Sequence, residues 1–126
     1  MTIKVHNIRN HRELYKQFES YENKIPTDDK GWFVYAGRGF NSPLGNPYRI
    51  GKDGDRNEVI QKFRQKLWDE LQLAELGTVT PLVREVRELA VLSETNDIHL
   101  FCWCAPEPCH CDVIKRCIEW INDVPF

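Results

Sequence analysis

The sequence predicts an α/β domain with a mainly parallel sheet flanked by helices, a small Rossmann-like arrangement. Two apolar runs with strand-like composition, residues 32–36 and 98–104, are separated by segments with helical periodicity. That alternation is typical of parallel strands joined by helical crossovers. The chain has 126 residues, the usual size of one domain, and no linker-like stretch divides it. We therefore expect a single domain over residues 1–126.

The first part of the chain predicts two strands with a helix and a loop between them. Residues 3–8 alternate between apolar and polar side chains, which predicts a short strand. Apolar and aromatic side chains at helical spacing follow in residues 11–21, and the polar stretch 25–31 predicts a loop. The continuous apolar run 32–36 then predicts a strand buried on both faces, as in the interior of a parallel sheet.

A long glycine-rich loop and two amphipathic helices are predicted next. Residues 37–54 hold five of the seven glycines, and a connection of this length is usually functional or disordered. Asp55 and Glu58 have the spacing of a capping box at the start of a helix that Gly77 ends. Thr80, followed by proline, predicts the cap of a second helix.

The strand predicted at residues 98–104 leads into a last helix. Residues 102–112 cover the end of this strand and the turn before the helix, and they hold four of the five cysteines. Ligands of open parallel sheets bind outside the carboxyl ends of the strands. Because segments 37–56 and 102–112 each follow a predicted strand, we expect them to line one crevice.

Composition excludes several classes of protein. Seventeen basic and nineteen acidic residues give a net charge of -2, which argues against a protein that coats nucleic acid or an anionic membrane. No stretch approaches the ~20 apolar residues of a membrane span, and the first residues lack the apolar core of a secretory signal. Five cysteines, four of them within ten residues, do not resemble a disulfide framework. We expect a cytoplasmic protein without a membrane partner, and the four tryptophans leave a homo-oligomer open.

Segment 37–56 carries the residue types of an anion site. Glycines let backbone amides approach a ligand closely, and a helix start presents unpaired N–H groups, which together suit a phosphate or a carboxylate. Arginines add bidentate hydrogen bonds to such an anion. The candidate ligand-binding residues here are Arg38, Gly39, Gly45, Asn46, Arg49, Asp55 and Arg56. The alternative interpretation is a glycine-shaped loop with solvated arginines.

Segment 102–112 carries a candidate nucleophile. Pro108 suits the first turn of a helix, which would place Cys109 and His110 at the positive end of that helix and lower the pKa of the Cys109 thiol. Cys109 and His110 are therefore the candidate catalytic pair. Cys104 and Asp112 complete the candidate ligand contacts.

Two other interpretations of the cysteines stay open. A zinc ion could be held by Cys102, Cys104, Cys109 and His110 or Cys111, since a strand projects its residues 102 and 104 to the same face, away from Trp103. Against zinc, the spacing lacks paired C-x-x-C motifs, and the adjacent side chains 109–111 are not expected to turn to one ion all together. The simplest interpretation is that free cysteines are small buried apolar residues. We expect no cofactor, with zinc as the alternative.

Two separated motifs resemble the domain-of-unknown-function family DUF4326, found in bacteria and their phages. The first motif contains Gly45-Asn46-Pro47, and the second contains Cys102-Trp103-Cys104 followed by Cys109-His110. The resemblance covers residues from about 32 to 122 and leaves 1–30 as an N-terminal extension. This chain has Cys111 where the family pattern usually has glycine, which favours Cys109, His110 and Asp112 as the functional residues. The resemblance implies no activity.

Together these segments predict binding of a nucleotide or a phosphorylated ribose compound at the strand ends. If the protein is an enzyme, we expect a hydrolase or transferase that processes nucleotides or nucleosides with Cys109 and His110. One alternative is a non-catalytic, phage-type protein that sequesters a nucleotide signal in the same pocket. Another is a zinc-stabilised interaction module. The expected location is the bacterial cytoplasm, or that of the host cell for a phage protein.

Overall fold

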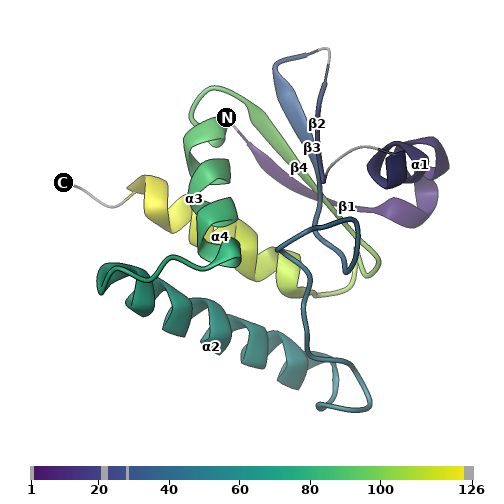
Figure 1. Cartoon of the computed structure of the whole chain (residues 1–126). Coiled ribbons are helices and arrows are strands. Elements are labelled where there is room, and N and C mark those ends of the chain that lie inside the picture. The colour runs from purple at the N-terminus through teal and green to yellow at the C-terminus, as the bar shows by residue number, and fades with distance from the viewer. Residues whose placement is uncertain (1, 21–22, 28, 124–126) are drawn as a thin grey trace.

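The protein folds around one open, mostly parallel sheet with helices on both faces, as a computed structural model shows (Figure 1). The structure describes residues 2–20, 23–27 and 29–123. The strands follow the order β1 (Ile3–Asn7), β4 (Asp97–Cys102), β3 (Gly31–Tyr35) and β2 (Lys24–Pro26). The first three strands are parallel, and β2 pairs antiparallel with β3 at the edge. The predicted α/β class and mainly parallel sheet are confirmed.

The helices lie in layers on the two faces of the sheet. A short 3-10 turn (Ile8–Asn10) and α1 (Arg12–Ser20) cover one face, and α3 (Pro81–Ser93) and α4 (His110–Asp123) cover the other (Figure 1). Helix α2 (Arg56–Glu75) packs on α3 and α4 as an outer layer. Among the described residues, no helix combines the length and apolar character that crossing a bilayer requires.

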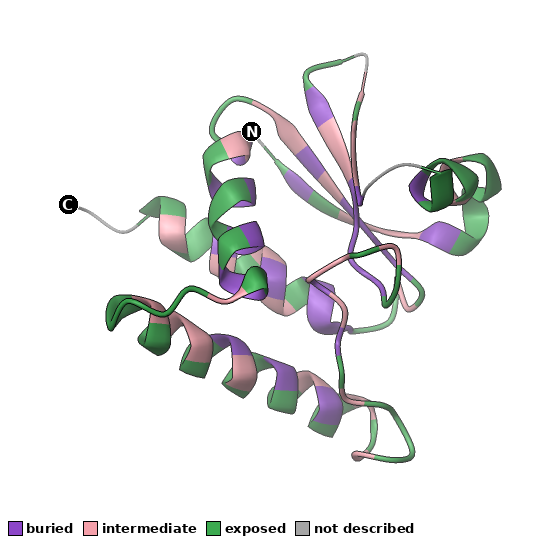
Figure 2. Cartoon of the chain, viewed as in Figure 1, coloured by how far each residue is buried: buried purple, intermediate pink, exposed green. Residues whose placement is uncertain are grey.

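Two apolar clusters lie on opposite faces of the sheet, because neighbouring strand residues point to opposite sides. Val34 and Leu100 pack with the helices α2, α3 and α4, whereas Tyr35 and Phe101 pack with Phe18 of α1. Burial is concentrated in the strands and in the inward stripes of the helices (Figure 2). As predicted from its continuous apolar run, β3 is covered on both faces.

The predicted caps are present, and they fix where the helices begin. Asp55 and Glu58 form the capping box of α2, with backbone-to-side-chain bonds of 2.9 and 3.1 Å. Thr80 caps α3, with Pro81 as its first residue. These sequence patterns are strong local signals, because each capping side chain accepts a hydrogen bond from a backbone N–H group that a helix start leaves without a partner.

The boundaries of β2, β4 and α4 differ from the sequence expectation. The stretch 25–31, predicted as a loop, contains part of β2, an edge strand whose last residue, Pro26, is a residue type that edge strands tolerate. The last strand ends at Cys102 and does not reach residue 104. Helix α4 starts at His110, so Cys109 lies just before the helix and not in its first turn.

Candidate functional site

A pocket of about 390 Å³ lies where β4 ends and where α2 and α4 begin. Its volume falls within the roughly 300–1,000 Å³ of small-molecule sites. The lining comes mainly from the two predicted segments: Gly37, Arg38, Asn46, Tyr48, Arg49, Ile50 and Arg56 from one, and Cys102, Trp103, Cys104, Pro108, Cys109 and His110 from the other, with Val59 and Ile60 of α2. The expectation that segments 37–56 and 102–112 share one crevice is confirmed.

Three arginines give this pocket a positive character. Arg38, Arg49 and Arg56 line it, and no carboxylate does so among the described residues. Arg56 is the first residue of α2 and His110 the first of α4, so both helix N-termini face the same space. Helix N-termini add partial positive charge and unpaired N–H groups. The pocket is therefore suited to an anion.

Arg38 and Asn46 hold the loop in shape. The Arg38 guanidinium donates from Nε to the Asn46 carbonyl oxygen at 2.6 Å and from Nη2 to the Tyr48 carbonyl oxygen at 2.9 Å. The buried Asn46 side chain donates to the Val59 carbonyl oxygen at 3.2 Å and accepts from the Tyr48 amide at 2.9 Å. Carbonyl oxygens carry no net charge, so the positive charge of Arg38 stays available to a ligand.

The two predicted glycines shape the loop and do not line the pocket. A Cβ atom at Gly45 would lie 2.9 Å from the Gly37 carbonyl oxygen and 3.0 Å from the Arg38 Cα atom, so only glycine lets these backbones meet. Gly39 has a φ of +93°, in the left-handed region that favours glycine.

Arg56 and Arg49 differ in how firmly they are held. Arg56 donates to the Pro108 carbonyl oxygen at 3.1 Å and pairs with the Glu107 carboxylate at 2.7 Å, which links α2 to the cysteine segment. A hydrogen bond with Cys104 raises the pKa of Arg56 further. The exposed Arg49 side chain forms no ion pair with any carboxylate in the described part of the chain. Arg49 is therefore the arginine most free to close on a ligand.

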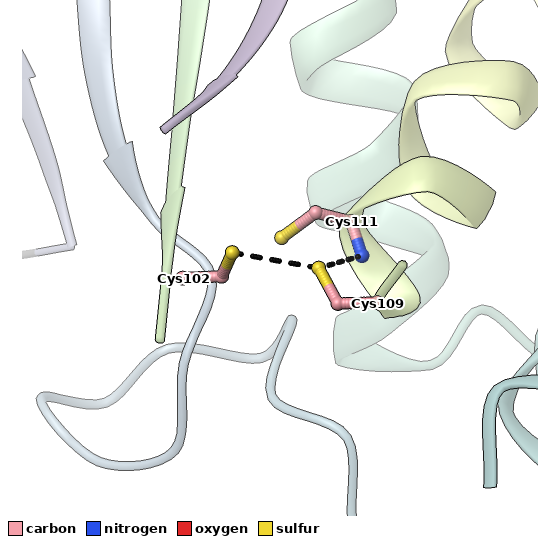
Figure 3. A group of neighbouring side chains, drawn as sticks. All are labelled: Cys102, Cys109 and Cys111. Carbon is pink, nitrogen blue, oxygen red and sulfur yellow. Dashed lines mark hydrogen bonds between the residues drawn. The ribbon is translucent and has the colours of Figure 1, made fainter. Parts of the chain in front are cut away.

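Three buried cysteines converge beside the pocket (Figure 3). Cys102 is the last residue of β4, Cys109 precedes α4, and Cys111 lies in the first turn of α4. Their sulfur atoms all lie within 4.8 Å of one another, and the Cys109 thiol donates to the Cys102 sulfur at 3.4 Å. The three residues are close enough to hold a metal ion.

The zinc ligand set expected from the sequence is wrong in two members. Cys104 lies outside the group of converging thiols because β4 ends at Cys102 and residue 104 belongs to the following turn. His110 points its ring away to the Ala36 carbonyl oxygen. Cys109 and Cys111 do converge, since one lies before the helix and the other within it.

The thiol that loses its proton most easily is Cys102. Hydrogen bonds from Cys109 and Cys111 lower the pKa of the Cys102 thiol, because they stabilise its thiolate. The same bond to Cys102 raises the pKa of Cys109, and burial raises it further. The expectation that the pKa of Cys109 is lowered is wrong, because the hydrogen bond with Cys102 and burial raise it.

His110 joins α4 to the end of β3. Its Nε2 atom lies 2.6 Å from the Ala36 carbonyl oxygen, and because a carbonyl only accepts, Nε2 donates. Burial lowers the pKa of His110, and its ring meets Phe63 edge-on at 5.1 Å between centroids. The imidazole is therefore neutral at pH 7, and its Nε2 proton is committed to the backbone.

The two predicted aspartates cap helices. Asp55 is the N-cap of α2, and the Asp112 carboxylate accepts from the Cys109 backbone amide at 3.0 Å. Neither aspartate lines the pocket. Their carboxylates hold the two helix starts in place around it.

Three aromatic or apolar residues that line the pocket were not predicted as site residues from the sequence. They are Trp103, Tyr48 and Ile50, which we call the rim. Trp103 is 41% exposed and lines the pocket, although strand alternation predicted it to point away from the cysteines. Its Nε1 atom donates to the Tyr35 hydroxyl oxygen at 2.9 Å. Tyr48 and Ile50 also line the pocket. A tryptophan between two cysteines at the end of a predicted strand is the sequence pattern from which Trp103 could have been predicted to line the pocket.

Comparison with known proteins gives one finding. The family described as domain of unknown function (DUF4326) matches residues 20–120. That span contains both pocket-lining segments and begins earlier than the expected residue 32. No curated protein and no solved structure matches the chain significantly.

Proposed function

The chain belongs to the DUF4326 family, and we propose from the chemistry of its pocket that it binds a nucleotide or a related phosphorylated ribose compound. The observation that carries this proposal is a pocket at the strand ends that is lined by three arginines and lies beside two helix N-termini. The place of the pocket at the carboxyl ends of parallel strands, on a sheet with helices on both faces, also supports a Rossmann-like description of the fold.

The arginines favour a phosphate over a neutral group. Arginine matches the oxygens of a phosphate with paired, charge-assisted hydrogen bonds. Arg38 is fixed by the loop carbonyls, whereas the side chain of Arg49 is exposed at the pocket mouth. A fixed and a movable arginine can hold one phosphate from two sides.

The rim favours a flat organic group attached to that phosphate. Trp103, which is 41% exposed, lines the pocket together with Tyr48 and Ile50. Stacking on an aromatic side chain contributes roughly 1–3 kcal/mol per base. A nucleobase against this rim and a phosphate among the arginines would use both chemistries of the pocket.

The geometry supports binding as the primary function, ahead of catalysis by Cys109 and His110. The pKa of Cys109 is raised, and His110 is a neutral donor to the backbone. Nucleophilic catalysis needs a thiolate beside a free base. This favours the non-catalytic alternative, a protein that sequesters a nucleotide signal, over a hydrolase or a transferase. Turnover of a nucleotide that the substitution Cys109→Ser abolishes would restore the enzyme proposal.

Calorimetric titration of the full chain with adenosine 5′-monophosphate tests the proposal. We expect Arg49→Ala to weaken binding by at least about tenfold, because it removes an arginine that no carboxylate in the described part of the chain engages. Adenosine, which lacks the phosphate, should bind more weakly than the monophosphate.

The matched control is Arg87→Ala, at an exposed arginine of α3 that does not line the pocket. This variant should bind the monophosphate as the native chain does. Equal affinity for adenosine and its monophosphate, or equal losses in the two arginine variants, would contradict the proposal.

A further inference from the structure

We propose that Cys102, Cys109 and Cys111 form a zinc site whose fourth coordination position opens into the arginine-lined pocket. Three sulfur atoms within 4.8 Å of one another are close to the arrangement that zinc needs. With zinc–sulfur bonds of about 2.3 Å, ligand sulfurs of a tetrahedral ion lie about 3.8 Å apart. The observed distance of 3.4 Å between the sulfurs of Cys102 and Cys109 needs only a small adjustment.

A backbone amide that donates to one of the sulfurs supplies a second observation. The Cys111 amide donates to the Cys109 sulfur at 3.3 Å. Such bonds orient metal ligands and stabilise the negative charge of thiolates. Cysteines that merely fill an apolar core need no donors of this kind.

The position of the three residues leaves one side of the ion open. Cys102 and Cys109 line the pocket, whereas Cys111 is fully buried and does not. A zinc ion on the three sulfurs would therefore face the pocket with its remaining position, which is the pattern of sites that keep an exchangeable ligand.

The surrounding charge suits this ion. Each cysteine thiol loses its proton when it binds zinc, so three thiolates and one Zn²⁺ carry a net charge of about −1. Arg38, Arg49 and Arg56 in the same pocket offset that charge. Zinc binding itself does not depend on the proposed function. The proposal that a phosphate oxygen takes the fourth coordination position does rest on the proposed function.

Cobalt(II), a coloured substitute for zinc, tests the site in the reduced, metal-free full chain. We expect one equivalent to produce the near-ultraviolet band of thiolate-to-cobalt charge transfer and the intense visible bands of a four-coordinate ion. Zinc should then abolish both. Cys111→Ser should lose about a third of the charge-transfer intensity, since one of three thiolates is gone, and should bind zinc at least about tenfold more weakly.

The matched control is Cys117→Ser, which removes a thiol of the same helix that lies outside the cluster. It should leave the cobalt spectrum and the zinc affinity unchanged. Circular dichroism of both variants checks that they fold. No charge-transfer band, a spectrum unaltered by Cys111→Ser in a folded chain, or stoichiometric binding of copper(I) without zinc would overturn the zinc site.

Adenosine 5′-monophosphate added to the cobalt-loaded protein tests the open position. A shift of the visible bands would support direct contact between the phosphate and the ion. Unshifted bands, together with calorimetric binding of the same nucleotide, would overturn that contact while leaving the nucleotide pocket in place. Absence of calorimetric binding with a normal cobalt spectrum would reject the nucleotide and keep the metal site.

Discussion

At the scale of single residues, three arginines with the same charge have different tasks. Arg38 supports the loop through two carbonyl oxygens, and Arg56 joins α2 to the cysteine segment through Pro108 and Glu107. The side chain of Arg49 is exposed and lines the pocket. Substituting Arg38 or Arg56 would therefore disturb the shape of the pocket, whereas substituting Arg49 changes mainly its charge.

One buried and two half-buried histidines make the stability of the fold depend on pH. Burial lowers the pKa of His110, and it also lowers the pKa of His6 and of His99. A histidine with a lowered pKa takes up a proton when the chain unfolds, so its contribution is complete above the unfolded value of about 6.5 and is lost as the pH falls below it. We expect the free energy of unfolding to decrease between pH 7 and pH 5.

Urea unfolding at a series of pH values measures this dependence. His110→Gln should make the slope shallower, because glutamine does not titrate and keeps an N–H donor for the Ala36 carbonyl oxygen. Arg87→Gln, at an exposed position of α3, serves as the control and should leave the slope unchanged. A slope that His110→Gln leaves unchanged, or a fold that gains stability on acidification, would contradict the account.

The arginines and cysteines of the pocket could be predicted from the sequence, whereas the orientation of the side chains after β4 could not. Arg38, Asn46 and Arg49 follow a strand, and loops after parallel strands gather at one edge of the sheet. The roles of Trp103 and Cys104 depend on where β4 ends. The alternation of side chains assigns them to faces of a sheet only within a strand. Because β4 ends two residues earlier than predicted, the faces predicted for Trp103 and Cys104 do not apply.

At the scale of elements, the start of α4 organises the site. The Asp112 carboxylate accepts from the Cys109 amide, and the Asp112 amide donates to the Cys109 carbonyl oxygen at 3.1 Å. Those two bonds fix the residue that carries one of the clustered thiols. Helix caps were predictable at Asp55 and Thr80 because their patterns are local. The short β2 was not, since its pairing with β3 is a tertiary contact.

Asp112→Ala should destabilise the fold by about 1 kcal/mol, the usual effect of losing a helix-capping bond. It should also weaken zinc binding, because the Cys109 backbone is no longer fixed. Thermal unfolding and cobalt titration measure the two effects. Glu119→Ala, at an exposed position of the same helix, is the control and should change neither. A stable Asp112→Ala variant would show that the cap contributes little.

At the scale of the whole molecule, the pocket exists because β3 and β4 are parallel neighbours. Tyr35 pairs with Phe101, so the chain leaves both strands at the same edge and brings together segments that are some sixty residues apart in sequence. The parallel sheet that the sequence predicts already implied that these two segments lie close together. The strand order β1-β4-β3-β2 was not predictable from the sequence, because helical periodicity does not state which strands are adjacent.

The central claim is that this shared edge binds a phosphorylated nucleotide. Mapping backbone amide chemical shifts during titration with adenosine 5′-monophosphate tests it most directly. The account predicts saturable shifts in both segments, at residues 37–56 and 102–110, with the far end of α3 unaffected. Shifts confined to one segment, shifts elsewhere on the surface alone, or no shifts at millimolar nucleotide would contradict it.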